Sequence, residues 1–69
     1  MKRNPVNSTN INSIGYDSVN QILEIEFQSG GIYQYPNVPE SVYNKLMLAE
    51  SKARYFHMNI KDTYSYRRI

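Results

Sequence analysis

The stretch QILEIEFQSGGIYQYPNVPE, residues 21–40, determines the expected fold. Within it, LEIEF (residues 23–27) alternates apolar and acidic side chains, a period of two that is typical of a half-buried antiparallel strand. QSGG (residues 28–31) predicts a hairpin turn, because glycine adopts positive φ without steric cost. IYQY (residues 32–35) is then the partner strand of the hairpin.

The residues before this hairpin predict one more strand. INSIGYD, residues 11–17, places Ile14 and Tyr16 on one face of an extended segment, and the turn-forming residues after it lead into the hairpin. Residues 1–10 are polar, and we expect them to form a flexible arm. Residues 11–69 are expected to form a single domain, because the chain is too short for a second core.

Two helical segments are expected after the hairpin. PESVYNKLMLAES, residues 39–51, begins with a proline suited to a first helical turn. Its apolar stripe has a spacing of 3.6 residues and extends into the next segment: Val42, Leu46, Ala49 and Ala53. A second segment, SKARYFHMNIKD (residues 51–62), places Phe56 and Ile60 four residues apart, and we expect Leu48 to contact it.

These elements predict an α+β fold. The expected architecture is a three-stranded antiparallel β-meander packed against one α-helix, followed by a second short helix and a polar tail. Three strands covered by a helix are sufficient for an independently stable domain.

Composition excludes several classes of protein. The 69 residues contain no cysteine and one histidine, so the sequence predicts no disulfide, no metal site and no cofactor. The N-terminal residues lack the apolar core of a secretory signal, and no apolar run is long enough to span a bilayer. We therefore expect a cytoplasmic protein without membrane contact.

Catalytic residue patterns are also missing. His57 has no recognisable nucleophile or oxyanion motif around it, and a lone Gly-Gly pair is not a phosphate loop. Glu24 and Glu26 share a strand face and could form an acid/base pair, but their alternation is explained more simply by a solvent-exposed sheet face. We expect that the chain is not an enzyme.

The distribution of charge raises the question of nucleic-acid binding. The net charge is only +2, yet residues 45–69 hold six of the eight basic residues and two of the six acidic ones, interleaved with aromatic residues. Such a mixture can hold phosphates and stack bases, although a solvated helical face is an equally open explanation. The candidate nucleic-acid-binding residues are Lys52, Arg54, Tyr55, Lys61, Tyr64, Arg67 and Arg68.

Tyr33 and Tyr35 leave two interpretations open. They point to the same face of a strand, so they could form a stacking platform for bases, or one wall of the hydrophobic core. If they share the face of Leu23 and Ile25, the helix covers them. The register between the two strands decides between these interpretations, and the sequence does not fix it.

Five segments, taken in order, resemble the KTSC domain, a family named after the C-terminal domain of some lysyl-tRNA synthetases and also found as small bacterial and phage proteins. They are SIGYD (13–17), LEIEF (23–27), G-x-YQY (31–35), VP-x-x-VY (38–43) and AESKARYFHMNIKDTYSY (49–66). The resemblance implies a small α+β domain of unestablished function, for which RNA binding has been suggested. It also implies that Tyr33 and Tyr35 are a family motif with a structural role. Ala53 departs from the glycine expected there.

Three functions remain as hypotheses. The first is a non-enzymatic module that binds RNA, for instance tRNA, through the basic and aromatic C-terminal third. The second is a protein-interaction adaptor of bacterial or phage origin. The third is a binder of small nucleotides.

Overall fold

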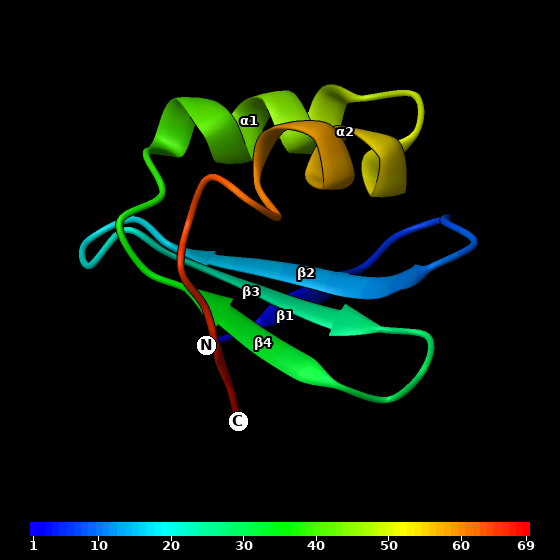
Figure 1. Ribbon diagram of the computed structural model, residues 1–69, viewed down its shortest axis with the longest axis horizontal. Helices are drawn as coiled ribbons and strands as arrows, with labels where there is room; N and C mark the ends of the chain where they lie inside the picture. Colours follow the sequence, from blue (N-terminus) through cyan, green and yellow to red (C-terminus); the bar gives the residue numbers. More distant parts are fainter.

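The computed structural model describes all 69 residues as an antiparallel sheet of five strands with two helices on one of its faces (Figure 1). The strands lie in the sheet in chain order, β1 to β5. The elements are β1 (Arg3–Pro5), β2 (Ile11–Asp17), β3 (Ile22–Phe27), β4 (Ile32–Tyr35), α1 (Glu40–Leu48), α2 (Lys52–Asn59) and β5 (Arg67–Arg68). The predicted α+β fold is confirmed, with the predicted meander forming β2 to β4.

The sheet extends beyond the predicted meander at both edges. Residues 1–10 were expected to be a flexible arm, but Arg3–Pro5 pairs with β2. The polar tail likewise contains β5, which pairs with β4. Strands of three and two residues are too short to show an alternating pattern, which is why the sequence did not predict them.

The core lies between the sheet and the helices. Nine buried side chains form it: Ile11, Ile14, Leu23, Ile25, Tyr35, Val38, Leu46, Phe56 and Ile60. A register shift between Ile11 and Ser13 places Ile11 on the same inner face as Ile14, because the extra residue inverts the alternation. Leu48, which we expected to contact the second helix, is instead 86% exposed.

The two helices are separate because the chain is extended between them. Ala49 at the end of α1 and Ser51 at the start of α2 both have extended backbone. The Ser51 hydroxyl caps α2 by accepting a hydrogen bond from the Arg54 amide at 3.3 Å. This break lets α2 run in its own direction over the sheet (Figure 1).

The outer face of the sheet carries a row of side chains that crosses all five strands. The strand register places Arg3 opposite Gly15, Gly15 opposite Glu24, Glu24 opposite Gln34, and Gln34 opposite Arg67. Residues that face each other across paired strands share a face. The row therefore reads Arg3, Gly15, Glu24, Gln34 and Arg67 from one edge to the other; we call it the outer-face row.

Hydrogen bonds connect the outer-face row. Arg3 donates a hydrogen bond to one Glu24 carboxylate oxygen and forms with it the only salt bridge of the structure. Gln34 donates to the other Glu24 oxygen at 2.8 Å. Arg67 donates to Gln34 at 3.1 Å. Glu24 is consequently only 3% exposed, which corrects the expectation that it lies on a solvent-exposed face. A carboxylate can be buried this way because each of its oxygens receives a donor.

Gly15 makes room for this arrangement. A Cβ at this position would lie 2.6 Å from the Lys2 carbonyl oxygen and 3.1 Å from Cγ of Arg3. The Arg3 side chain thus passes over Gly15 to reach Glu24. The conformation of Gly15 is not the reason for glycine here; the close approach of β1 is.

These contacts also determine the ionisation of Glu24. Burial on its own raises the pKa of the Glu24 carboxyl, but hydrogen bonds from Gln34 and Arg3 and the charge of Arg3 outweigh it, so the pKa is lowered overall.

We predict that Gly15→Ala destabilises the domain by about 1–3 kcal/mol, because the added methyl group meets the backbone of β1 and displaces Arg3 from Glu24. Urea denaturation of the variant measures the loss, with Ser18→Ala in an exposed turn as the control. An unchanged denaturation midpoint for Gly15→Ala would contradict the close packing of β1.

The lowered pKa of Glu24 predicts a pH dependence of stability. A carboxyl whose pKa is lower in the folded than in the unfolded chain stabilises the fold above about pH 4.3 and loses this contribution as the pH falls through the folded-state pKa. We expect the urea concentration at the unfolding midpoint to decrease as the pH is lowered below about 4.3. In Glu24→Gln this decrease should be less steep. Parallel curves for the two proteins would show that Glu24 does not carry this effect.

Candidate ligand-binding groove

The strand register settles which face the two tyrosines of β4 occupy. Tyr33 lies opposite Ile25, and Tyr35 lies opposite Leu23, so both tyrosines point to the helix-covered face. Tyr35 is 3% exposed and belongs to the core, whereas Tyr33 is half-buried. Tyr35 therefore forms part of the core wall, while Tyr33 keeps a surface that a ligand can reach.

An aromatic cluster surrounds these tyrosines. Phe27 makes edge-to-face contacts with Tyr33 and Phe56, at ring-centroid distances of 5.4 Å and 5.3 Å. Tyr66, which directly precedes β5, lies 5.1 Å from Tyr33 and 5.7 Å from Tyr35. Aromatic pairs prefer such offset and edge-to-face geometries. Together β3, β4, α2 and the residue before β5 contribute one aromatic surface.

The buried position of Tyr35 changes the pKa of its phenol. Burial, together with the neighbouring Tyr66 and Tyr33, raises the pKa of Tyr35 to about 12. Its phenol is therefore neutral at every physiological pH.

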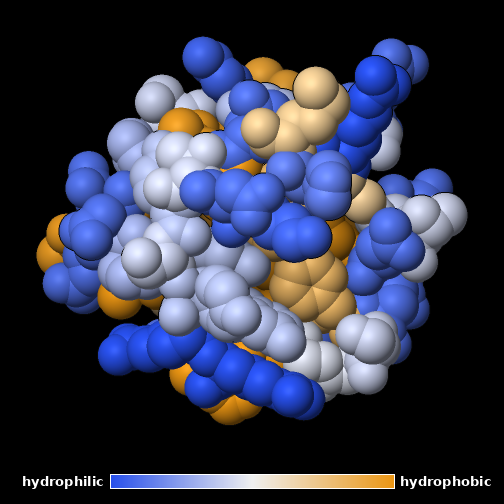
Figure 2. Space-filling model, in the orientation of Figure 1, coloured by the Kyte–Doolittle hydropathy of each residue, from blue (hydrophilic) through white to orange (hydrophobic).

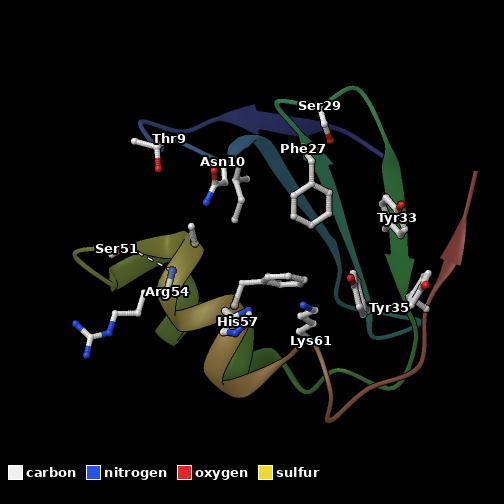
Figure 3. Close-up of a pocket in the computed structure, with 14 residues that line it drawn as sticks. Thr9, Asn10, Phe27, Ser29, Tyr33, Tyr35, Ser51, Arg54, His57 and Lys61 are labelled. Carbon is white, nitrogen blue, oxygen red and sulfur yellow. Dashed lines mark hydrogen bonds between the residues drawn. The ribbon is translucent and has the colours of Figure 1, made fainter.

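An open groove of about 620 Å³ lies over this aromatic surface, between the sheet and α2 (Figure 3). Phe27, Tyr33 and Tyr35 project from the strands on one side, and His57 and Arg54 come from α2 on the other (Figure 3). In Figure 2 apolar atoms reach the surface between the helical layer and the sheet, with hydrophilic side chains around them. The full lining is Thr9, Asn10, Ile11, Phe27, Ser29, Tyr33, Tyr35, Ser51, Ala53, Arg54, Phe56, His57, Lys61 and Tyr66.

The groove is one-sided in charge. Arg54, His57 and Lys61 line it, and none of its 14 lining residues is acidic. Arg54 and His57 stand three residues apart on α2 and so share a helix face, and Lys61 follows the helix closely. The only salt bridge of the structure joins Arg3 to Glu24, so the charges of Arg54 and Lys61 are not neutralised by a carboxylate within the chain. The groove combines flat apolar surface with positive charge.

The structure brings some of the predicted site residues together and separates others. Arg54 and Lys61 line the groove, and Arg68 stands over the Tyr33 ring at 5.9 Å from its centroid. Lys52 lies in a smaller hollow that adjoins the groove. Tyr55 and Tyr64 are half-buried against the core. Arg67 faces the opposite side of the sheet, where it binds Gln34.

Several lining residues were not among the predicted site residues. Phe27, Phe56 and Tyr66 form much of the aromatic floor, and His57 lines the groove from α2. The first two fit a core pattern in the sequence, because their rings pack on the core and also border the groove. Tyr66 could have been found only by recognising β5, which places it beside β4.

Comparison with known proteins places this arrangement in a family. The family sequence model of the KTSC domain matches residues 7–64 of this chain. An uncharacterized protein of Stutzerimonas stutzeri is 44% identical over 70 residues, covering all of this chain and 99% of the relative. A crystal structure of a KTSC domain protein from Yersinia pestis superposes with a TM-score of 0.96 at 47% identity, and covers 99% of this chain and 96% of that one.

A segment of a larger enzyme is also similar. A lysine–tRNA ligase of Trichormus variabilis is 43% identical over 54 residues, which cover 78% of this chain and 10% of the ligase. The similarity thus concerns a small part of that enzyme.

The different burial of the tyrosines predicts graded stability effects. Tyr35→Ala should destabilise the domain by about 3–5 kcal/mol, as large aromatic truncations in a core do. Tyr33→Ala should cost less, and Tyr66→Ala least, because Tyr66 is 58% exposed. Chemical denaturation of the three variants tests this order. Equal losses for Tyr33 and Tyr35 would contradict the placement of Tyr33 at the groove.

Proposed function

The chain belongs to the KTSC domain family, and we propose that it is a non-enzymatic module that binds a short single-stranded segment of RNA in the groove. Bases would stack on the aromatic floor, and Arg54 and Lys61 would meet the phosphates. Single-stranded RNA is commonly held by stacking on aromatic side chains beside basic residues.

The observation that carries the proposal is the combination of an aromatic floor and unpaired cations in one hollow. Phe27, Tyr33 and Phe56 supply the ring surfaces, and Arg54 and Lys61 supply positive charge without a carboxylate in the lining. A purely structural aromatic cluster would not need charge of one sign beside it. A phosphate-bearing aromatic ligand uses both features at once.

The size of the groove limits the ligand. About 620 Å³ lies within the ordinary range of small-molecule sites. A duplex would need a wider contact surface, so a few unpaired nucleotides are the largest segment that the groove accommodates. A free mononucleotide fits the same space and is the second candidate ligand.

The sheet edges favour this function over a protein adaptor that works by strand addition. β1 has three residues and ends in Pro5, and β5 has two residues. Short edges that contain proline or charged residues are poor templates for an added strand. The similarity to a segment of a lysine–tRNA ligase, an enzyme that by its name acts on tRNA, also supports an RNA ligand.

We predict salt-sensitive binding of tRNA or single-stranded RNA, measured by fluorescence anisotropy at several salt concentrations. Arg54→Ala and Lys61→Ala should each weaken binding and lower the slope of log K against log salt by about one, since each removes one phosphate contact. Lys45→Ala, an exposed substitution on α1, is the matched control and should leave the slope unchanged.

The same experiment identifies the ligand class. Competition by a nucleoside monophosphate at equal molar concentration would assign the site to small nucleotides. An absence of RNA binding at low salt, or an equal loss for Lys45→Ala and Arg54→Ala, would contradict the proposed groove.

A further inference from the structure

A second hollow with different chemistry adjoins the groove. This hollow measures about 260 Å³ and is lined by Asn7, Ser8, Thr9, Glu50, Ser51 and Lys52; we call it the polar notch. Thr9 and Ser51 line both hollows, so the two are neighbours. Figure 3 shows these two residues at the end of the groove that lies away from Tyr33 and Tyr35.

The lining of the polar notch fits a sugar better than a base or a phosphate. It contains no hydrophobic residue, so a base would find no surface on which to stack. Glu50 is one of its lining residues, and its negative charge offsets the positive charge of Lys52, so the notch does not attract a phosphate as the groove does. Hydroxyls, an amide and a carboxylate are partners for the hydroxyl groups of a ribose, which can both donate and accept hydrogen bonds.

Part of this polar lining is already engaged within the chain. The Ser8 hydroxyl accepts hydrogen bonds from the amides of Asn10 and Ile11, both at 3.3 Å. Ser51 caps α2, and the Lys52 ammonium donates to the Ala49 carbonyl at 3.3 Å. These contacts fix the shape of the notch.

The Glu50 carboxylate remains available to a ligand. It is exposed, and the salt bridge of the structure joins Arg3 to Glu24 on the far side of the sheet. A carboxylate only accepts hydrogen bonds, so its partner in a sugar is a hydroxyl group. Within a nucleic acid strand the 3′- and 5′-oxygens are bonded to phosphate, so the 2′-OH is the ribose hydroxyl that can still donate a hydrogen bond. It is present in RNA and absent from DNA.

We propose that the polar notch binds the ribose of the nucleotide next to the one stacked in the groove, with Glu50 accepting a hydrogen bond from its 2′-OH, so that the domain selects RNA over DNA. This inference rests on the proposed function, because it needs a base in the groove. A deoxyribose would leave the Glu50 carboxylate facing the ligand without a donor.

The test compares an RNA and a DNA oligonucleotide of the same unstructured sequence at one salt concentration. We expect the wild-type protein to bind the RNA about tenfold more tightly, the contribution of one hydrogen bond to a charged group. Glu50→Ala should bring the ratio of the two affinities close to one. Asp62→Ala removes the same charge outside both hollows, and should raise both affinities together while the ratio stays as in the wild type.

The outcomes separate the two proposals. Equal wild-type affinities for RNA and DNA, or a ratio that Glu50→Ala does not change, would overturn the assignment of the notch while the groove remains the binding site. A lack of binding to either oligonucleotide at low salt would overturn the proposed function and the notch with it. A ratio that collapses in Glu50→Ala but not in Asp62→Ala supports the inference.

Discussion

The buried Glu24 carboxylate and its donors are the contacts on which the edges of this sheet depend. β1 and β5 are too short to be held by backbone hydrogen bonds alone, and each supplies an arginine to the outer-face row. Arg3 reaches Glu24 over Gly15, and Arg67 reaches it through Gln34. The Glu24 carboxylate on the central strand is thereby linked by hydrogen bonds to both edge strands. Without these donors, a buried carboxylate at this position would destabilise the fold.

This constraint extends to the groove on the other face. Because Arg67 is directed outward, the alternation of β5 directs Tyr66 and Arg68 inward, against Tyr33. The network on the outer face therefore positions one wall of the groove. The opposite wall depends on the break at Ser51, which lets α2 place Phe56 on the aromatic floor and Arg54 at the Ser51 end of the groove (Figure 3). The sheet and a separately directed helix together form the groove.

The sequence predicted those parts of the molecule that carry a clear period. Alternation in residues 23–27 was sufficient for β3, and the helices followed from the stripe through Val42 and Leu46 and from the four-residue spacing of Phe56 and Ile60. It did not predict β1 and β5, because two or three residues carry no period. Nor did it predict the burial of Glu24, since alternation assigns a face without showing what covers it. The sequence predicted part of the candidate site, because Arg54 and Lys61 followed from the distribution of charge. Phe27 and Phe56 were not predicted, since they have the pattern of ordinary core residues. The position of Tyr33 depended on a strand register that only the structure shows.

The most direct measurement is an amide chemical-shift titration of the isotope-labelled domain with a short single-stranded RNA. We predict that the perturbed amides cluster around the groove, at Phe27, Tyr33, Arg54 and His57, while Gln34 and Arg67 of the outer-face row stay unchanged. Perturbations centred on the outer-face row, or none at saturating RNA, would contradict the account that the aromatic and cationic groove is the binding site.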